Sequence, residues 1–296
     1  MSDRQRGVVL VTVLWLMALL SALAMAASIT FRGFASVVAL DRDRVQAEAL
    51  LTGGIEAAVQ TIDNLGDAPL AEFETTISLV PGSVRTHLSD EGGRIDIGKA
   101  PVEVLAALFR SVGASERDAD AIALAIARWR NPADTVGGAA DRLQAPAAPP
   151  GAPVKKANAA LPFTDIRQLA LIPGMAPEWV TAIEPLATVY GNETVNPLSA
   201  PAQVIAALPG VDQSSAQAFV QMRNNFSADV SQVASFLRTD QKYLAVKKPS
   251  AVSMHLMATL VNGFAQAARA VIVPVPEGAQ PYRILVWDLL SSQSAE

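Results

Sequence analysis

The chain has 296 residues, of which 51% are hydrophobic, 17% are charged and 5% are aromatic, and its formal net charge is −5. This length allows one large domain or two small ones with a buried core. The absence of cysteine excludes disulfide bonds, thiolate nucleophiles and cysteine-ligated metal sites. The acidic balance argues against bulk binding to nucleic acid, because phosphate contacts need a basic surface.

An uncharged apolar segment extends from Val8 to Phe31. A helix rises ~1.5 Å per residue, so this segment is long enough to cross a hydrocarbon core of ~30 Å. Arg4 and Arg6 precede it, and the positive-inside rule therefore places the N-terminus in the cytoplasm and the bulk of the chain outside.

Three interpretations of this segment are open. A cleaved secretory signal is one, since Ala24-Met25-Ala26 fits a small-residue cleavage site. An ordinary N-terminal anchor is the second. The third is a prepilin-like leader, because Arg4-Gln5-Arg6-Gly7 followed by apolar residues resembles a site that a dedicated peptidase cuts after the glycine.

The next segment has the pattern of a helix. Apolar residues recur at helical spacing from Phe34 to Ile62, and the first proline of the chain is Pro69. We expect one helix over residues 8–64, with a weak point at Gly53-Gly54, where each glycine costs roughly 1 kcal/mol relative to alanine. A cleaved signal does not need such continuity, whereas a pilin-type stalk does.

Short β-rich runs occur at both ends of the remaining chain. The predicted strands are residues 75–80, 83–88, 251–260, 265–275 and 282–289. The first two are separated by Pro81-Gly82, and Asn262-Gly263 is a strong hairpin signal between two of the others. The alanine-rich segment between the two groups is predicted to be helical and to be inserted within a helix-plus-sheet domain.

The helical segment contains an internal repeat. Residues 95–108 align with residues 195–208, and each copy reads as an extended segment, a small-residue turn and the start of a helix. Two further turns, Leu171–Met175 and Leu208–Val211, have the pattern of helix-hairpin-helix turns, whose backbone N–H groups can face a phosphate. Their flanking helices carry few lysines or arginines, which favours a structural or protein-facing role.

Residues that could carry chemistry are few. The two histidines, His87 and His255, lie in strand-like runs without a suitably spaced carboxylate, and we interpret them as ordinary strand residues. Neither phosphate-loop motif, G-x-x-x-x-G-K-[ST] or G-x-G-x-x-G, occurs. Asn131, Asp134 and Asp141 lie around glycines in a loop whose oxygen ligands can hold calcium, although their spacing does not fit an EF-hand. We expect no enzymatic activity, and calcium is the one cofactor that the sequence suggests.

Taken together, these motifs resemble minor pseudopilin K of type II secretion systems over nearly the whole chain. The motifs are Gly7 with its apolar run, Gln46-Ala47, Gly54–Ala57, the extended segments 90–97 and 195–200, and Phe163–Leu169 continuing to Pro173-Gly174-Met175. One departure concerns the loop after Trp129, which carries fewer carboxylates than the aspartate-rich loop of the family.

The resemblance implies a role and a set of partners. A prepilin peptidase would cut after Gly7, and the new N-terminal residue, Val8, would be methylated. Most pseudopilins have glutamate at the fifth mature position, where this chain has Thr12. Lack of that carboxylate fits a terminal place, in which the protein caps the pseudopilus tip and helps to initiate assembly. Implied partners are the I- and J-type minor pseudopilins, the major pseudopilin and inner-membrane lipid, with no nucleic acid.

The predicted fold is α+β, with a pilin-like long N-terminal helix on an antiparallel sheet and a large inserted all-α domain that contains helix-hairpin-helix-like turns. We divide the chain into a leader (1–7), the membrane half of the helix (8–31), its periplasmic half with the first strands (32–99), the inserted helical domain (100–245, with a flexible loop over 144–160) and the last strands (246–296). The expected location is the inner membrane, with a single span and a periplasmic bulk.

Two other classes of protein remain as alternatives. One is a membrane-anchored helix-hairpin-helix protein that binds nucleic acid. The other is a secreted or periplasmic binding protein with a cleaved signal.

Overall fold

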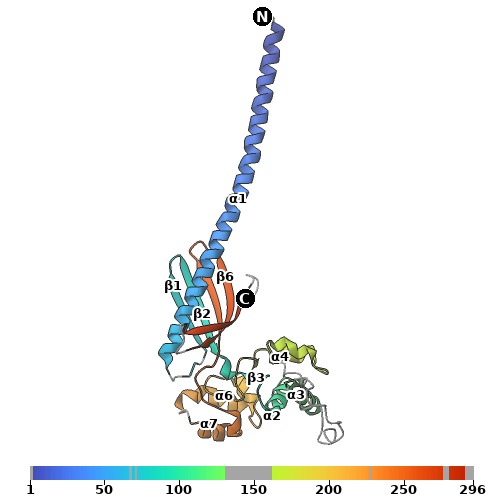
Figure 1. Cartoon of the computed structure of the whole chain (residues 1–296), viewed down its shortest axis with the longest axis vertical. Coiled ribbons are helices and arrows are strands. Elements are labelled where there is room, and N and C mark those ends of the chain that lie inside the picture. Colours follow the sequence, from blue (N-terminus) through green and yellow to red (C-terminus); the bar gives the residue numbers. More distant parts are fainter. Residues whose placement is uncertain are drawn as a thin grey trace, which may run out of the picture.

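The computed structural model describes residues 3–66, 69–70, 72–130, 162–226, 229–275 and 280–290, and it describes only the backbone of residues 3–11, 27–33 and 225. Its longest element is α1 (Asp3–Leu65), a single helix of 63 residues. The N-terminal half of α1 projects away from the rest of the molecule (Figure 1). Where the sequence predicts a helix over residues 8–64, the structure has one unbroken helix.

A five-stranded sheet lies against the C-terminal half of α1. Its strands, in spatial order, are β1 (Phe73–Leu79), β2 (Gly82–Asp90), β5 (Val252–Leu260), β6 (Ala265–Pro274) and β7 (Tyr282–Leu290). All neighbouring strands are antiparallel. The prediction that the early hairpin pairs with the C-terminal strands is therefore confirmed, as is the mixed class of helix plus antiparallel sheet.

The first hydrophobic core lies between α1 and this sheet. Ala47, Leu51 and Ile55 of α1 are buried with the inward-facing residues of the strands, such as Val84 and Leu256. Residues on the sheet alternate between this face and the opposite one, as the pleat of a β-strand requires. We call α1 residues 47–65 and the sheet the head of the molecule.

The two adjacent glycines of α1 lie where the helix meets the sheet. A Cβ atom on Gly54 would lie 2.7 Å from Cγ1 of Val84 and 3.1 Å from Cδ2 of Leu256. The sequence suggests a weak point here, but the helix continues through it. Lack of a side chain at Gly54 lets the helix approach the sheet closely, and burial of the surrounding apolar side chains compensates for the low helix propensity of glycine.

The chain between β2 and β5 forms a mainly helical block beyond the end of the sheet (Figure 1). Its α-helices are α2 (Val102–Ser111), α3 (Glu116–Arg130), α4 (Pro177–Ile183), α5 (Ala202–Ala206), α6 (Gln213–Met222) and α7 (Val230–Leu237). Short 3-10 helices are η1 (Glu91–Gly93), η3 (Ile166–Leu171), η4 (Arg223–Asn225) and η5 (Gln241–Tyr243). β3 (Ile95–Asp96) and β4 (Ala187–Thr188) pair in parallel.

A second hydrophobic core holds the block together. Leu105, Phe109, Ile126 and Phe219 are among its buried members. Ile95 also belongs to this core, so the packing of the block begins before Ala100, the residue at which the sequence suggested a boundary. The reason is the pairing of β3 with β4, a contact between segments far apart in the chain.

One predicted helical segment has a tighter form. Residues 163–171 lie in the segment that the sequence predicts to be helical, and the structure has the 3-10 helix η3 over Ile166–Leu171. Asp165 caps it by accepting a hydrogen bond from the backbone N–H of Arg167, and the turn at Pro173-Gly174 follows soon after. A segment this short favours the 3-10 geometry, which is common in isolated pieces of a few residues.

Candidate functional site

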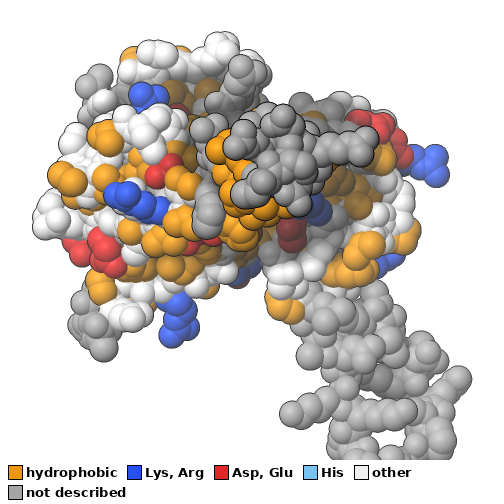
Figure 2. Space-filling model, turned by 90° about the horizontal axis from the view of Figure 1, so that it is seen from above, with side chains coloured by type: hydrophobic (Ala, Val, Ile, Leu, Met, Phe, Trp, Pro, Cys, Tyr) orange, Lys and Arg blue, Asp and Glu red, His pale blue; other side chains and the backbone are white. Residues whose placement is uncertain are grey.

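The projecting part of α1 presents apolar side chains to the surroundings. Trp15 is 74% exposed, and Phe34 and Val45 are each 66% exposed. Seen from above, apolar side chains gather at the centre of the view, where α1 projects towards the viewer, and elsewhere they are mixed with polar and charged side chains (Figure 2). An apolar surface of this kind on a single chain marks a place of contact with lipid or with another protein.

Among the helices whose residues the structure describes, none meets the length and apolarity needed to cross a membrane.

The predicted processing residues lie at the start of α1. Gly7 and Val8 belong to the helical backbone, but their side chains lie outside the described residues. Thr12 lies on α1 and is exposed.

The residues of the predicted calcium loop, Asn131, Asp134 and Asp141, also lie outside the described residues. In the part of the chain that the structure describes, no group of three or more His, Asp or Glu side chains is arranged to hold a metal ion.

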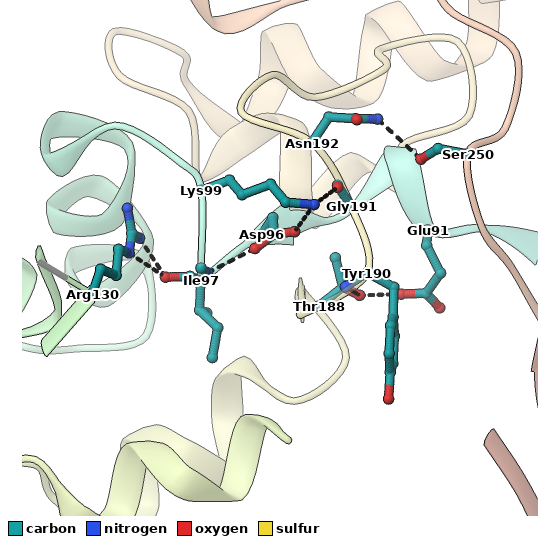
Figure 3. A network of polar contacts seen from close by, with 11 residues as sticks. Glu91, Asp96, Ile97, Lys99, Arg130, Thr188, Tyr190, Gly191, Asn192 and Ser250 are labelled. Atoms are coloured by element: carbon teal, nitrogen blue, oxygen red, sulfur yellow. Dashed lines mark hydrogen bonds and ion pairs between the residues drawn. The ribbon is translucent and has the colours of Figure 1, made fainter. Parts of the chain in front are cut away.

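A buried polar junction connects the head to the block, and Figure 3 shows part of it. Glu91 follows β2 directly, and its side chain is buried. The hydroxyl of Thr188 in β4 donates a hydrogen bond to Glu91, and the Arg94 guanidinium lies 3.5 Å from the Glu91 carboxylate. The carboxylate therefore holds the end of the sheet against β4 of the block.

Asp96 continues this polar network within the block. Its Oδ1 accepts a hydrogen bond of 2.7 Å from the backbone N–H of Gly98, and its Oδ2 lies 3.4 Å from Nζ of Lys99. The same Lys99 ammonium donates to the carbonyl of Gly191 at 2.7 Å, as Figure 3 shows. Burial raises the pKa of Asp96, while the charge of Lys99 acts in the opposite direction.

Arg130, the last residue of α3, contacts the turn that precedes α2. Its Nε and Nη2 both donate to the carbonyl of Ile97, with an Nε–O distance of 2.8 Å, and its Nη1 donates to the carbonyl of Ala100 at 2.7 Å. Burial lowers the pKa of Arg130 to about 10, and nearby Asp96 partly offsets this effect. The forked guanidinium thereby fastens the end of the α2–α3 hairpin to its beginning.

Asp90 is a second buried carboxylate that joins the head to the block. Its carboxylate accepts hydrogen bonds from the Gly92 N–H at 2.8 Å, the Ser199 hydroxyl at 2.7 Å and the Asn196 amide at 3.3 Å. Burial raises its pKa, and the hydrogen bonds counteract that rise. Asp90 thus connects the last residue of β2 to the second repeat of the block.

The internal repeat found in the sequence is also a repeat in structure. Asn196 accepts a hydrogen bond from the N–H of Leu198, as Asp96 does from the N–H of Gly98. Arg223, at the start of η4, donates to the carbonyl of Ala200 at 3.0 Å, and Arg130 does the same at Ala100. Sequence reasoning found the two turns but missed both arginines. Each lies at or just beyond the end of the second helix of its repeat, and this shared position is the signal that could have identified it.

The turn at residues 208–211 is packed against the chain after α7. A Cβ atom on Gly210 would lie 2.9 Å from the carbonyl oxygen of Arg238, and the Thr239 hydroxyl donates to the carbonyl of Pro209 at 2.7 Å. A phosphate could not approach this turn without displacing those contacts. By contrast, a Cβ on Gly174 in the other turn would meet nothing within 4 Å.

The two histidines are brought together by the sheet. His87 of β2 and His255 of β5 lie directly opposite each other. Both lie on the face of the sheet turned away from α1, since their neighbours Leu88 and Leu256 are buried in the first core. The sequence did not predict this proximity, because the residues are separated by the whole block.

These observations describe a long helix with an exposed apolar surface, a head and a block held to the head by buried carboxylates. Most of the hydrogen bonds described here involve a backbone N–H or C=O group. They therefore fix the positions of backbone segments relative to one another.

Comparisons with known proteins agree with this architecture. Residues 86–192, which include most of the junction and the α2–α3 hairpin, match the family model described as Type II secretion system (T2SS), protein K. The fold is similar to a chain in "The Crystal Structure of the GspK-GspI-GspJ complex from enterotoxigenic Escherichia coli Type 2 Secretion System". The TM-score is 0.54 at 16% sequence identity, and the match covers 85% of this chain and 100% of that chain. A search of curated proteins found no match. The family model thus matches residues 86–192 and not the rest of this chain, and the likeness to the solved structure, at 16% identity, is a likeness of fold.

Proposed function

We propose that this protein is the minor pseudopilin of a type II secretion system that caps the tip of the periplasmic pseudopilus and helps to initiate its assembly for the export of folded proteins. The family match over residues 86–192 carries the proposal. A secretion-system component of this family works in the cell envelope. The proposed role is structural, in line with a junction whose polar groups hold backbone segments in place.

The shape of the molecule supports a terminal position. The block lies at the end of the head opposite to the projecting half of α1 (Figure 1). A subunit stacked further from the membrane along the same axis would meet the block, whereas subunits nearer the membrane can pack along α1. A head of this shape therefore suits the end of a filament better than its shaft.

Membrane anchoring through residues 8–31 is part of the proposal. It rests on the uncharged sequence from Val8 to Phe31 and on the arginines before it. Cleavage would occur after Gly7, and Val8 would become the methylated N-terminus. In most members of the wider pseudopilin group a glutamate follows at the fifth mature position. Thr12 offers no carboxylate, so this subunit would not supply that charge to a neighbour within the bilayer.

The proposed partners are other minor pseudopilins. The solved structure with the similar fold is a complex of GspK with GspI and GspJ. We extend that assembly to this chain as binding to I- and J-type subunits, with the major pseudopilin below them. The exposed apolar residues of α1 between Phe34 and Val45 are the surface proposed for helix packing.

N-terminal sequencing and intact mass of the protein purified from membranes test the processing step. The expected mature chain starts at Val8 and carries one added methyl group. Gly7→Trp should block cleavage, and Ser2→Trp, the same change five residues earlier, should be processed normally. A mature chain that starts near Ser28 would show a cleaved signal and contradict the pseudopilin proposal.

Co-purification tests the partner assignment. Full-length protein extracted from membranes in mild detergent should retain the I- and J-type subunits encoded with it. Recovery of a correctly processed chain without either subunit, from cells that produce all three, would contradict the tip-complex role while leaving the processing result intact.

A further inference from the structure

The face of the sheet turned away from α1 carries a pair of potential metal ligands. His87 and His255 are the only histidines of the chain, and the register of β2 and β5 places them directly opposite each other. His87 is partly buried and His255 is exposed, so solvent and a small ion can reach the pair.

A neighbouring pair shows how closely side chains meet on this face. Ser89 and Ser253 are opposite each other two residues further along the same strands, and their Oγ atoms lie 2.7 Å apart. Opposite pairs of an antiparallel ladder alternate between a wide and a narrow type, so pairs two residues apart share one type and one face. The Cβ atoms of directly opposite residues lie about 4.5–5.5 Å apart. Two imidazole rings on such a pair can direct one nitrogen each to the same point, about 2.0–2.1 Å from an ion between them.

The charges around the pair set how strongly an ion would be held. Arg269 of β6 is opposite His255, and Glu74 of β1 is opposite His87. The arginine charge repels a cation. Glu74 is engaged by Arg85, whose Nε lies 3.3 Å from its carboxylate in an exposed ion pair.

We propose that His87 and His255 together bind a divalent transition-metal ion of the Zn²⁺ class, with water completing its coordination. Imidazole is a preferred ligand for Zn²⁺, Cu²⁺ and Ni²⁺. Because no third His, Asp or Glu of the described residues converges with this pair, the two histidines are the only protein ligands that we assign. Calcium is excluded for this site, since it selects oxygen ligands.

The position of the pair gives the ion a structural consequence. β2 leads into the helical block and β5 leads out of it. An ion shared by His87 and His255 would cross-link the two strands from which the block extends. The chain has no cysteine and so no disulfide bond that could do this. Since the two ligands come together only in the folded sheet, binding would stabilise the folded state.

Calorimetric titration of the full-length protein in detergent with Zn²⁺ tests the proposal. The wild type should bind one ion per chain, and His87→Gln and His255→Gln should each weaken binding at least about tenfold, as loss of one of two ligands implies. Arg269→Gln should strengthen binding, because it removes the neighbouring positive charge. Ser253→Ala, on the same face of the same strand, is the matched control and should bind as the wild type does.

Folding of each variant is checked by its circular dichroism and thermal midpoint without metal. X-ray absorption spectroscopy at the zinc edge should show two imidazole nitrogens among the ligands of the bound Zn²⁺. Absence of Zn²⁺ binding by the folded wild type, or unchanged binding by both folded histidine variants, would overturn the proposal. The readout is metal binding, so the result is independent of the secretion role.

Discussion

Gly54 of α1 lies so close to Val84 of β2 that a Cβ atom on Gly54 would come within 2.7 Å of Cγ1 of Val84. Val84 is fully buried in the first core, so it has little room to move. The close approach of helix and sheet therefore depends on the missing side chain. A residue that lowers helix propensity locally is here a requirement of packing.

Gly54→Ala should destabilise the head even though alanine is the better helix former. We expect a loss of about 1–3 kcal/mol, the usual cost of inserting a carbon atom into a packed core. The measurement is chemical denaturation of the full-length protein in detergent, followed by the sheet signal in circular dichroism.

Gly53→Ala is the matched control for that experiment. A Cβ on Gly53 would lie 3.1 Å from Cδ1 of Leu79, the end of a flexible and partly exposed side chain. This variant should be neutral or gain up to about 1 kcal/mol from helix propensity. Equal destabilisation by both substitutions would contradict the packing argument.

Arg130→Gln should loosen the α2–α3 hairpin. The arginine donates to the carbonyls of Ile97 and Ala100, and its loss leaves these partly buried acceptors without their charged donor. Hydrogen bonds to a charged group contribute about 1.5–3 kcal/mol each, so a loss of at least about 2 kcal/mol is expected. Amide hydrogen exchange in residues 97–130 should increase accordingly.

Arg223→Gln is the comparison variant in the second repeat. Arg223 donates one hydrogen bond, to Ala200, and should cost less than Arg130 when replaced. If the Arg223 variant is the more destabilised of the two, the argument that Arg130 makes the stronger attachment is wrong.

Asp96→Asn should change how stability depends on pH. Burial raises the pKa of Asp96 above its ordinary value of 3.8, so the folded state binds the proton more tightly than the unfolded state does. The stability contributed by this group is thus present below about pH 3.8 and is lost as pH rises through the raised pKa. The asparagine variant lacks this loss, and its stability relative to the wild type should improve from pH 3 to pH 7. Urea unfolding across that range measures the difference.

Lys99→Met tests the ionisation of Asp96 by removing the positive charge beside it. The Lys99 ammonium lowers the pKa of Asp96, so removing it should destabilise the protein at neutral pH and have less effect near pH 3. In the Asp96→Asn background the Lys99→Met change should lose most of its pH dependence. A stability difference between Asp96→Asn and wild type that stays constant with pH would show that the carboxylate does not titrate as described.

The protein should show no salt-dependent binding to DNA. In one of the two turns with the helix-hairpin-helix pattern, Gly210 and Pro209 are packed against Arg238 and Thr239, and few lysines or arginines flank either turn. A mobility-shift titration of the full-length protein with double-stranded DNA at 50 and 200 mM salt checks this. Binding that weakens steeply between the two salt concentrations would support the alternative of a membrane-anchored nucleic-acid-binding protein.

Much of the fold could be predicted from local patterns. The helical spacing from Phe34 to Ile62 and the turns at Pro81-Gly82 and Asn262-Gly263 are short-range signals, and the structure has the corresponding elements. The 3-10 form of η3 was not predicted, since its difference from an α-helix depends on one hydrogen-bond register over six residues.

The contacts of the candidate site were mostly beyond the reach of sequence reasoning. Glu91 and Thr188 are 97 positions apart, and Asp90 and Ser199 are 109 apart. Neither pair follows a pattern of spacing in the sequence. The first is created by the pairing of β3 with β4, and the second by the packing of the second repeat around η1. The same holds for Arg130, whose partners Ile97 and Ala100 lie 33 and 30 positions earlier in the chain.

The sequence by itself determined the helix, the strands, the absence of disulfide bonds and the internal repeat, because these depend on composition and on neighbours a few residues apart. Only the tertiary structure decided that Gly54 is a contact and not a weak point, that buried carboxylates join head and block, and that His87 meets His255. The physical reason is shared. Burial and close approach are properties of pairs, and the partners in these pairs are brought together only when α1, the sheet and the block have packed.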